Sequence, residues 1–351
     1  PFHSRWRHFE VGHGSRLATL KTRLAELSPV EKACSQFDLA ITSVLLDAGA
    51  GADWQYQEPA TGDRYGRSEG LAVASFHLFC QGGFSSDRAN PLQADAIALQ
   101  QFTDAQLAAG FQVSPTNPLV GLSGRSALLR QLGSTLYRYP HLFGSDHPRP
   151  GHLVYFLKEQ TTNGELPASK VFQAFQEGFS DIWAGRISLA GVNLGDVWHH
   201  PALAPSLPHS PTPSSLVPFH KLSQWLTYSL LEPLQDLGIT ITGLDQLTGL
   251  PEYRNGGLCL DLGLLLVKDE IVLEQSHAPS SEVIVEWRAL TVILLDRIAE
   301  TVRQKLELNA NQLPLVKILQ GGTWTAGRKI AAAKRADGVP PIQIISDGTV
   351  F

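Results

Sequence analysis

The chain carries apolar residues at the three- and four-residue spacing of amphipathic helices over most of its length. Within 15–28 the spacing is made by four leucines: Leu17, Leu20, Leu24 and Leu27. This pattern predicts a helix there. Comparable patterns, several of them closed by glycine, predict further helices over 68–81, 91–109, 122–136, 168–178, 218–237 and about 281–308.

Patterns typical of β-strands are few. Three short segments suggest strands: 239–242, 259–267 and 341–346. Because the predicted helices far outweigh these segments, we predict a mainly α-helical fold with a small β component (α+β).

Two proline-rich segments interrupt the helical patterns, at 138–152 and at about 199–217. Proline lacks a backbone N–H group and fixes φ, so neither segment can be regular structure throughout. The second segment is also rich in serine, and we interpret it as a connector or a lid. Because candidate site residues lie on both sides of it, we predict a single catalytic domain over 1–351.

The composition is that of a globular protein and excludes two classes of partner. Of the 351 residues, 43% are hydrophobic and 17% are charged, which is enough for a sizeable core. The formal net charge of −5 offers no broad positive field to a nucleic-acid backbone, so we expect no nucleic-acid partner. No apolar run reaches the length of about 18 residues that a membrane span needs, so we expect no membrane partner.

The cysteines and histidines point to no metal and to a reducing environment. Cys34, Cys80 and Cys259 lie far apart, and they match neither a disulfide framework nor a C-x-x-C metal site. This usage favours a cytoplasmic setting, and residues 1–10 lack the apolar centre of a signal peptide. The 12 histidines include no H-E-x-x-H pattern, so we predict no metal site.

Charged side chains interrupt the apolar segment 250–266. Buried charges need partners or a function. Glu252 and Arg254 are compatible with a buried salt bridge as well as with a site. Asp261 alternates with leucines in the predicted strand 259–267, and either a structural ion pair or a catalytic carboxylate explains it.

Two predicted helices carry further polar groups. Lys221 and Gln224 share one face of the helix 218–237, which is either a solvated face or the wall of a polar cavity. Glu286 and Arg288 interrupt an otherwise apolar helix. Glu286 either takes part in surface ion pairs with residues further along the helix, such as Arg297, or these charges face a cavity, and we favour the cavity.

Two other patterns have weaker implications. Residues 42–54 resemble the strand and G-x-G loop of nucleotide binders, but turn-forming residues follow the glycines in place of a helix, so we expect no organic cofactor. The cluster of Arg328, Lys329, Lys334 and Arg335 could hold a phosphate or a carboxylate. For Lys334 and Arg335 we favour a solvated helix face.

Several blocks together resemble the uracil-catabolism protein 4 (urg3-like) family: SVLLDAGAGADW, RSEGLAVASFHLF, SPTNPLVGLSGRSALL, LVPFHKLSQWLTYSLLEPL, LTGLPEYRNGGLCLDLG, VEWRALTVILLDRIA, LQGGTWTAGRKIA and SDGTVF. The resemblance covers nearly the whole chain. It implies a route in which uracil becomes a nucleotide, the ring is opened, and a ribosylurea-type intermediate loses its sugar. It therefore implies a step at or near cleavage of this ureido N-glycosidic bond, and we expect an N-ribosyl hydrolase that releases urea and ribose or ribose phosphate.

A more distant resemblance links three motifs to the queuosine nucleoside N-glycosylases. That family has an Asp-Tyr-Arg motif, preceded by a Lys-x-x-Gln helix and followed by a Glu-x-Arg-Ala helix. The same order is found here in Lys221 and Gln224, then 252–254, then 286–289. Glu252 replaces the aspartate. The resemblance implies a helical architecture similar to that of DNA glycosylases.

These resemblances imply a site for a small ribosyl substrate. A carboxylate beneath the ribose stabilises the positive charge that develops during cleavage, and we expect Glu252 in this role with Asp261 as its rival. Lys221, Gln224 or Arg288 would protonate or hydrogen-bond the leaving urea. The predicted substrate-binding residues are Lys221, Gln224, Tyr253, Arg254, Asn255, Glu286, Trp287 and Arg288.

Within this site, we expect Glu286 to hold Arg288 or to bind ribose hydroxyls. We expect Tyr253 and Trp287 to form the walls of a small cavity on which the carboxylates converge. Two alternatives remain open. One is a nucleotide-handling transferase, such as a uracil phosphoribosyltransferase, that uses the glycine loop in 42–54. The other is a non-catalytic partner in the same pathway.

Overall fold

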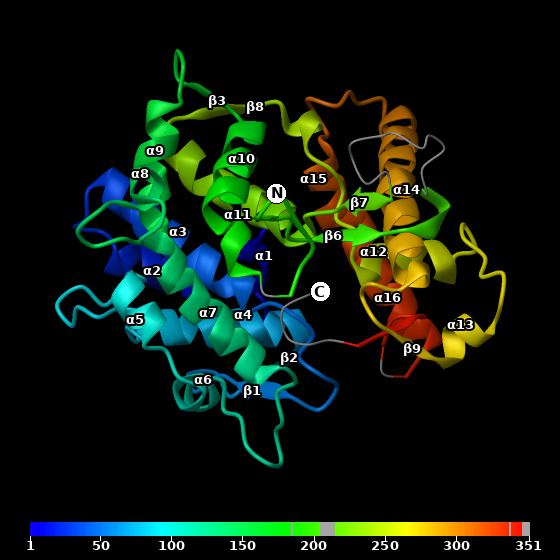
Figure 1. Ribbon diagram of the computed structural model, residues 1–351, viewed down its shortest axis with the longest axis horizontal. Helices are drawn as coiled ribbons and strands as arrows, with labels where there is room; N and C mark the ends of the chain where they lie inside the picture. The colour runs from blue at the N-terminus through cyan, green and yellow to red at the C-terminus, as the bar shows by residue number, and fades with distance from the viewer. Residues whose placement is uncertain (184, 204–214, 337, 346–351) are drawn as a thin grey trace. The chain divides into compact units, whose positions relative to one another are not determined.

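A computed structural model describes residues 1–183, 185–203, 215–336 and 338–345 (Figure 1). The contacts between Cα atoms divide the chain into two units. Unit 1 comprises Pro1–His3, Gly185–Gln224 and Leu244–Ser346, and unit 2 comprises Ser4–Ala184 and Trp225–Gly243. The expected single domain stays a prediction.

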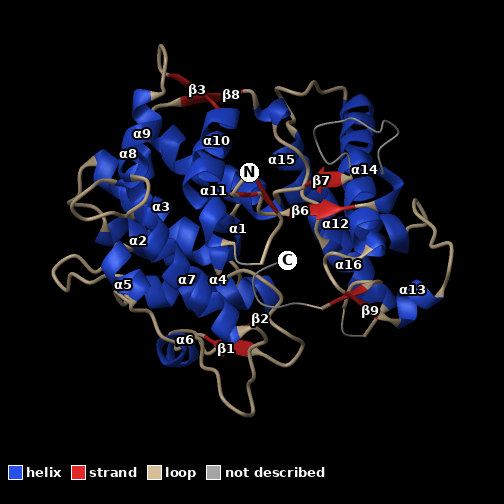
Figure 2. Ribbon diagram, in the orientation of Figure 1, coloured by secondary structure: helices blue, strands red, loops and turns tan. Residues whose placement is uncertain are grey.

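The prediction of a mainly α-helical fold with a small β component is confirmed. Helices hold 54% of the residues, and Figure 2 shows the strands as short pieces between them. Every sheet formed by the described residues has two strands. No helix in the described part of the chain is both long and apolar enough to span a membrane. The implied likeness to DNA glycosylases stays a prediction.

Unit 2 is built from helices with two small sheets. Its helices are α1 (Arg5–Phe9), α2 (Arg16–Arg23), α3 (Pro29–Leu45), α4 (Arg67–Cys80), α5 (Ala96–Gln100), α6 (Asp104–Gly110), α7 (Leu122–Leu136), α8 (Pro140–Phe143), α9 (Leu153–Glu159) and α10 (Ala168–Phe179). Its strands are β1 (Gln55–Gln57), β2 (Arg64–Gly66), β3 (Glu165–Pro167) and β8 (Thr240–Thr242), paired β1 with β2 antiparallel and β3 with β8 parallel. A further helix, α11 (Lys221–Asp236), begins in unit 1 and continues in unit 2 from Trp225.

Helix α3 lies at the core of unit 2, where it packs against α1, α4, α7 and α9. The hydroxyl of Ser28 accepts a hydrogen bond from the N–H group of Glu31, and Pro29 occupies the first turn, where no N–H group is needed. Between Ala33 and Leu45 nearly every residue is buried. A helix that is buried nearly all round, with small polar residues such as Ser35 and Thr42 among its buried positions, lacks the one-sided pattern of an amphipathic helix, so the sequence analysis missed it.

The segment 42–54 is not built as a phosphate-binding loop. The first residues of this segment form the last turn of α3, and the segment is followed by the strand β1 instead of a helix. The buried guanidinium of Arg125 donates hydrogen bonds to the carbonyl oxygens of Leu46 (2.5 Å), Ala48 (3.1 Å) and Gly49 (2.7 Å). A phosphate loop needs N–H groups around its ligand, whereas carbonyl oxygens line the centre of this loop.

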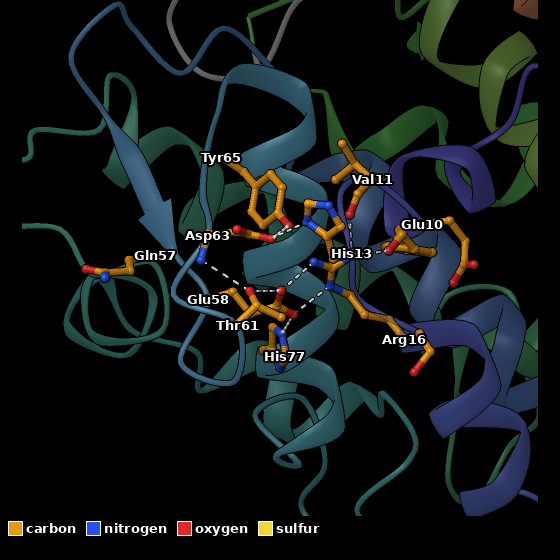
Figure 3. A network of polar contacts seen from close by, with 12 residues as sticks. Glu10, Val11, His13, Arg16, Gln57, Glu58, Thr61, Asp63, Tyr65 and His77 are labelled. Carbon is orange, nitrogen blue, oxygen red and sulfur yellow. Dashed lines mark hydrogen bonds and ion pairs between the residues drawn. The ribbon is translucent and has the colours of Figure 1, made fainter.

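A buried ion pair connects three parts of unit 2 (Figure 3). Arg16, at the start of α2, donates hydrogen bonds of 2.7 and 2.6 Å to the two carboxylate oxygens of Glu58. Its other N–H groups donate to the carbonyl oxygens of Phe9 and Val11, both at 2.8 Å. His77 of α4 lies 2.8 Å from the same carboxylate. The pair therefore joins the start of α2, the turn between β1 and β2, and α4.

Unit 1 holds the residues that the sequence analysis singled out. After the start of α11 its helices are α12 (Tyr253–Asp261), α13 (Ile271–Glu274), α14 (Glu282–Leu306), α15 (Leu315–Ile318) and α16 (Trp324–Lys334), with a π-helical turn, η5 (Leu319–Thr323), between the last two. Its strands are β4 (Ser188–Leu189), β5 (Val192–Asn193), β6 (Val197–His199), β7 (Leu216–Pro218), β9 (Ser276–His277) and β10 (Gln343–Ile344). Helix α12 packs against both α14 and α16 (Figure 1).

Most predicted helices are confirmed near their predicted positions: α2, α4, α7, α10, α11 and α14. The single helix predicted over 91–109 is wrong, because two short helices, α5 and α6, occupy the segment. Thr103 starts α6 with a capping box, in which its hydroxyl and the side chain of Gln106 satisfy each other's backbone N–H groups. Helix α11 begins at Lys221 because Pro218 is the last residue of β7.

The strand predicted over 259–267 is wrong, whereas β8 and β10 confirm parts of the other two predicted strands. Helix α12 extends to Asp261, and Gly263 follows in a left-handed conformation with φ of +74°. An apolar run this short cannot be assigned to helix or strand by its periodicity alone. Glu252 caps the start of this helix, nine positions before its last residue.

The proline-rich connector at about 199–217 is described only near its ends, because residues 204–214 lie outside the described residues. Beside it, β6 and β7 pair antiparallel, with Val197 opposite Pro218. The lid interpretation stays a prediction.

Replacing Glu58 by glutamine is expected to lower the free energy of unfolding by roughly 3–5 kcal/mol, because the buried charge of Arg16 loses its carboxylate. Chemical denaturation of the full chain measures this change. The control is Glu177→Gln, since Glu177 is half exposed and pairs with His141 at the surface, where such pairs contribute about 1 kcal/mol or less. Equal effects of the two substitutions would contradict the structural role of the buried pair.

Candidate functional site

The carboxylate of Glu252 caps the N-terminus of α12. Its oxygens accept hydrogen bonds from the backbone N–H groups of Arg254 (2.8 Å) and Asn255 (2.7 Å), and the residue is 8% exposed. A carboxylate just before a helix satisfies first-turn N–H groups and interacts favourably with the helix dipole. Helix α12 therefore holds this carboxylate in one orientation.

Burial raises the pKa of Glu252 above its ordinary value, although two backbone hydrogen bonds and the charges of Lys221 and Arg254 oppose the shift. Lys221, the first residue of α11, is itself buried. A buried carboxylate with a raised pKa beside a cation is typical of groups that work in catalysis. Helix capping alone accounts for the hydrogen bonds but not for the buried lysine.

A second carboxylate, that of Asp196, was missed by the sequence analysis. It forms a bidentate ion pair with Arg288, with N–O distances of 2.8 and 2.7 Å, and it accepts hydrogen bonds from the N–H group of Lys221 (3.0 Å) and the indole of Trp198 (2.6 Å). Burial alone raises its pKa, but the charge and hydrogen bonds of Arg288 outweigh burial and hold the pKa well below the usual range. Asp196 is therefore ionised and committed to its partners.

The guanidinium of Arg288 is held on several sides. It lies 4.1 Å from the ring centroid of Phe219, and its Nε donates to the carbonyl oxygen of Pro251 at 3.3 Å. Arg288 is only 3% exposed. These contacts fit a residue that positions its neighbours.

His220 was also missed by the sequence analysis. It precedes α11 in a left-handed conformation with φ of +49°, which is costly for a residue with a Cβ and is concentrated at functional sites. Burial lowers its pKa; the negative charge of Asp196 opposes this shift and the positive charge of Arg288 adds to it. Its imidazole is therefore neutral at neutral pH, a form that can both donate and accept a hydrogen bond.

Lys221 and Gln224 share a buried face, so the solvated-face interpretation is wrong for this pair. The side-chain oxygen of Gln224 accepts a hydrogen bond from the N–H group of Thr248 at 3.3 Å. Gln224 thereby contacts the segment that leads into α12.

Arg254 lies close to two aromatic rings. Its guanidinium carbon is 5.3 Å from the ring centroid of Tyr253 and 5.2 Å from that of Trp324, and the residue is 5% exposed. The alternative of a salt bridge between Glu252 and Arg254 is not what is found, because Glu252 bonds to the backbone of Arg254.

Asn255 follows Glu252 by three residues and is buried, and the buried ring of Trp287 lies against Gly256 of the same helix. Asn255 donates from its side-chain amide to the carbonyl oxygen of Leu250 at 3.1 Å. Among the described residues, neither the amide oxygen of Asn255 nor the indole nitrogen of Trp287 has a hydrogen-bond partner. Buried polar groups are nearly always satisfied, so these two atoms are exceptions among the described residues.

Asp261, the expected rival of Glu252, is paired elsewhere. It is the last residue of α12 and accepts hydrogen bonds of 2.8 and 2.5 Å from the guanidinium of Arg335. The solvated face that we favoured for Arg335 is therefore wrong. Asp261 follows Glu252 by nine positions, a helical rise of about 13.5 Å, so the two carboxylates do not converge on one cavity.

Glu286 points to solvent from α14, so the expected pairing of Glu286 with Arg288 is wrong. Asp196 takes that place. The structure gathers the other predicted residues in buried positions around the start of α12: Lys221, Gln224, Glu252, Arg254, Asn255, Trp287 and Arg288. Tyr253 lies at the edge of this group, half-buried.

Glycines let the neighbouring helices approach α12. A Cβ on Gly256 would lie 2.8 Å from the Trp287 ring and 2.8 Å from the hydroxyl of Thr291. A Cβ on Gly327 of α16 would lie 2.2 Å from the carbonyl oxygen of Arg254. No real Cβ tolerates such distances, so α14 and α16 pack closely on α12 only because glycine occupies these positions.

Unit 2 contains a cleft of about 460 Å³ that includes none of the predicted site residues. It is lined by Trp6, Arg7, Leu17, Leu20, Lys21, Leu24, Ala25, Pro29, Lys32, Ala33, Gln36, Glu232, Pro233, Asp236 and Leu237. Within the part of the chain that the structure describes, no group of three or more His, Cys, Asp or Glu side chains could hold a metal ion.

Comparison with known proteins matches the whole chain to one family. The model of the DUF1688 family, described as a protein of unknown function, matches residues 1–351. The chain is 41% identical over 377 aligned residues to Uracil catabolism protein 4 of Lachancea kluyveri, covering all of this chain and 85% of that protein. It is 42% identical over 356 residues to Protein urg3 of Schizosaccharomyces pombe, covering all of this chain and 84% of that protein.

Replacing Gly256 by alanine is expected to lower the free energy of unfolding by about 1–3 kcal/mol, because the added methyl group overpacks the contact with Trp287. Denaturation measured by tryptophan fluorescence tests this expectation. The control is Gly321→Ala, since a Cβ there meets no atom within 4 Å. A harmless Gly256→Ala would show that α12 and α14 do not need their close approach.

Proposed function

The chain belongs to the DUF1688 family, and because one of its relatives is named Uracil catabolism protein 4, we infer that it has a role in uracil catabolism. Within that role we propose that it is an N-ribosyl hydrolase. Its substrate is a ribosylurea-type intermediate, which it cleaves to urea and ribose or ribose phosphate. The motif resemblance to queuosine nucleoside N-glycosylases supports the same chemistry.

The observation that carries this proposal is the environment of Glu252. Cleaving an N-ribosyl bond develops positive charge on the anomeric carbon and the ring oxygen. A buried, oriented carboxylate stabilises that charge more strongly than a hydrated one and can also direct a water molecule to the carbon. Glu252 meets both requirements, whereas Asp261 is neutralised by Arg335 at the other end of α12.

The leaving urea nitrogen needs a proton or a strong hydrogen bond. We assign this role to Lys221, whose charge acts on Glu252, with the neutral imidazole of His220 next to it in the chain. Arg288 was an earlier candidate, but its bidentate pair with Asp196 commits it to positioning. The remaining buried polar groups, Gln224 and Asn255, then bind substrate.

The loop in 42–54 lends no support to a nucleotide-handling transferase, because the guanidinium of Arg125 already binds its carbonyl oxygens. The hydrolase is therefore preferred over that alternative. A turnover assay distinguishes the hydrolase from a non-catalytic partner, because only the hydrolase releases urea.

Glu252→Gln is expected to lower kcat for release of urea from ribosylurea by about 100-fold or more, because the neutral amide cannot stabilise the developing charge. Stopped assays of urea release from purified protein measure the loss. Glutamine keeps the size of the side chain and its oxygen still accepts one hydrogen bond, so the fold is preserved.

The matched control is Asp261→Asn, which removes a buried carboxylate from the same helix. It is expected to lower stability but to leave kcat of the folded protein within about threefold, because Asp261 does not touch the substrate. If Glu252→Gln turned over substrate at the wild-type rate, the assignment of Glu252 as the catalytic carboxylate would be refuted. If the wild-type protein released no urea, the hydrolase proposal itself would be refuted and the non-catalytic partner would be favoured.

The raised pKa of Glu252 predicts the pH dependence of the reaction. The carboxylate acts in its ionised form, so activity is low below the pKa and rises as pH passes through it. Because burial places this pKa above the ordinary glutamate value of 4.5, the acidic limb of kcat/KM should lie above pH 4.5 and disappear in Glu252→Gln. A limb at or below pH 4.5 would contradict the proposed environment.

A further inference from the structure

The cleft of about 460 Å³ in unit 2 lies between helices, and the proposed hydrolase mechanism uses none of its residues. Its walls come from α1, α2, the start of α3 and the end of α11. The volume lies in the range of sites that bind small molecules, which are mostly apolar and carry a few placed polar groups. The cleft is therefore a candidate for a second ligand site.

Apolar side chains form most of the walls. On α2, Leu17, Leu20 and Leu24 recur at helical spacing, and Leu20 and Leu24 are only 3% and 2% exposed. From α3 come Pro29 and Ala33, whose short side chains fill little of the space. Aliphatic walls favour the hydrocarbon part of a ligand, because each methylene group removed from water strengthens binding about fourfold.

Pro233 of α11 determines how the indole of Trp6 is held in the wall. Proline has no N–H group, so the carbonyl oxygen of Ser229, four residues earlier in the helix, lacks its helical donor. The indole N–H group of Trp6 donates a hydrogen bond to this oxygen at 2.7 Å. Because this bond uses the one polar group of the indole, the rest of the ring offers apolar surface to the cleft.

One of the two carboxylates that line the cleft is already neutralised. One oxygen of Glu232 pairs with the guanidinium of Arg7 at 2.7 Å, and the other accepts a hydrogen bond from the hydroxyl of Ser4 at 2.6 Å. The second carboxylate, that of Asp236, is exposed in the last turn of α11. Only Asp236 therefore adds an uncompensated negative charge to the lining.

The positive groups of the lining keep unused donors. The ammonium groups of Lys21 and Lys32 form no hydrogen bond or ion pair within the ranges that the structure describes. The Nε atom of Arg7 is buried and has no hydrogen-bond partner there. Lys32 also lies in the first turn of α3, where the helix dipole favours a negative charge. These three residues form a cationic rim that outweighs the single carboxylate of Asp236.

We propose that the cleft binds an aliphatic carboxylate of the medium-chain fatty-acid class. Its hydrocarbon chain lies against the leucines of α2, and its carboxylate lies at the cationic rim. A carboxylate accepts hydrogen bonds from ammonium and guanidinium donors, and such charge-assisted bonds are roughly twice as strong as neutral ones. A neutral amphiphile leaves the charge of the rim unused, and a cationic one is repelled by it. This second site goes beyond the proposed function.

Isothermal titration of the full chain, with each ligand below its micelle concentration, tests the site. Octanoate is expected to bind at least about 10-fold more tightly than octan-1-ol, because its carboxylate adds charge-assisted hydrogen bonds. Decanoate is expected to bind about 10-fold more tightly than octanoate, because it buries two further methylene groups. Octyltrimethylammonium, which has the same chain and the opposite charge, is expected to bind no more tightly than the alcohol.

The double variant Lys21→Gln/Lys32→Gln is expected to reduce the preference for octanoate over octan-1-ol to about threefold or less. Neither lysine side chain has a partner within the described ranges, so the variant keeps the fold. The matched control is Lys158→Gln/Lys170→Gln, which removes two exposed positive charges from the same unit outside the cleft. The control should leave the preference unchanged.

Three results would overturn the proposal: no measurable binding of octanoate, equal affinity for octanoate and octan-1-ol, or equal losses in the two double variants. Light scattering tests whether a second copy of the chain covers the cleft instead. A dimer that Lys21→Gln/Lys32→Gln abolishes and that octanoate does not dissociate would also overturn the proposal. Urea release plays no part in these measurements, so their outcome is independent of the hydrolase.

Discussion

The bidentate ion pair between Asp196 and Arg288 is the contact on which the arrangement of the site depends. It connects α14 to the loop before β6, and through further hydrogen bonds it reaches the start of α11 and the carbonyl oxygen of Pro251 just before α12. Both helix starts that carry the proposed chemistry are thus positioned by one ion pair, in which Arg288 is buried and Asp196 is partly buried. Removing either partner of such a pair typically costs 3–5 kcal/mol, about the scale on which a domain's whole stability is measured.

The two carboxylates near these helix starts have opposite environments. Asp196 is surrounded by hydrogen-bond donors and by the positive charge of Arg288, so its carboxylate stays ionised and holds neighbouring segments in place. Glu252 is buried with weaker compensation, so its pKa is raised. Pairs of acidic groups whose pKa values are driven apart are characteristic of active sites, where one group holds the geometry and the other reacts. This division supports Glu252 as the proposed catalytic group.

The spacing of apolar residues predicted the fold class and most amphipathic helices, because a helix that buries one face carries apolar residues at regular positions along that face. It failed where burial is not one-sided. Helix α3 is buried nearly all round, with polar as well as apolar residues inside, and the segment 259–267 is too short to distinguish a helix end from a strand. The capping carboxylate of Glu252 was visible in the sequence, yet its role as a cap was not, because a glutamate at that position is equally compatible with an ion pair.

The sequence by itself determined that the chain is helical and that charged residues near 221, 252 and 288 are embedded in apolar surroundings. Only the tertiary structure decided how those charges pair. Asp196 lies 92 residues from Arg288, and Arg335 lies 74 residues from Asp261, so no local pattern links the partners. Ion pairing depends on distances of a few ångströms between side chains, and chain packing sets these distances only after helices from remote segments have come together.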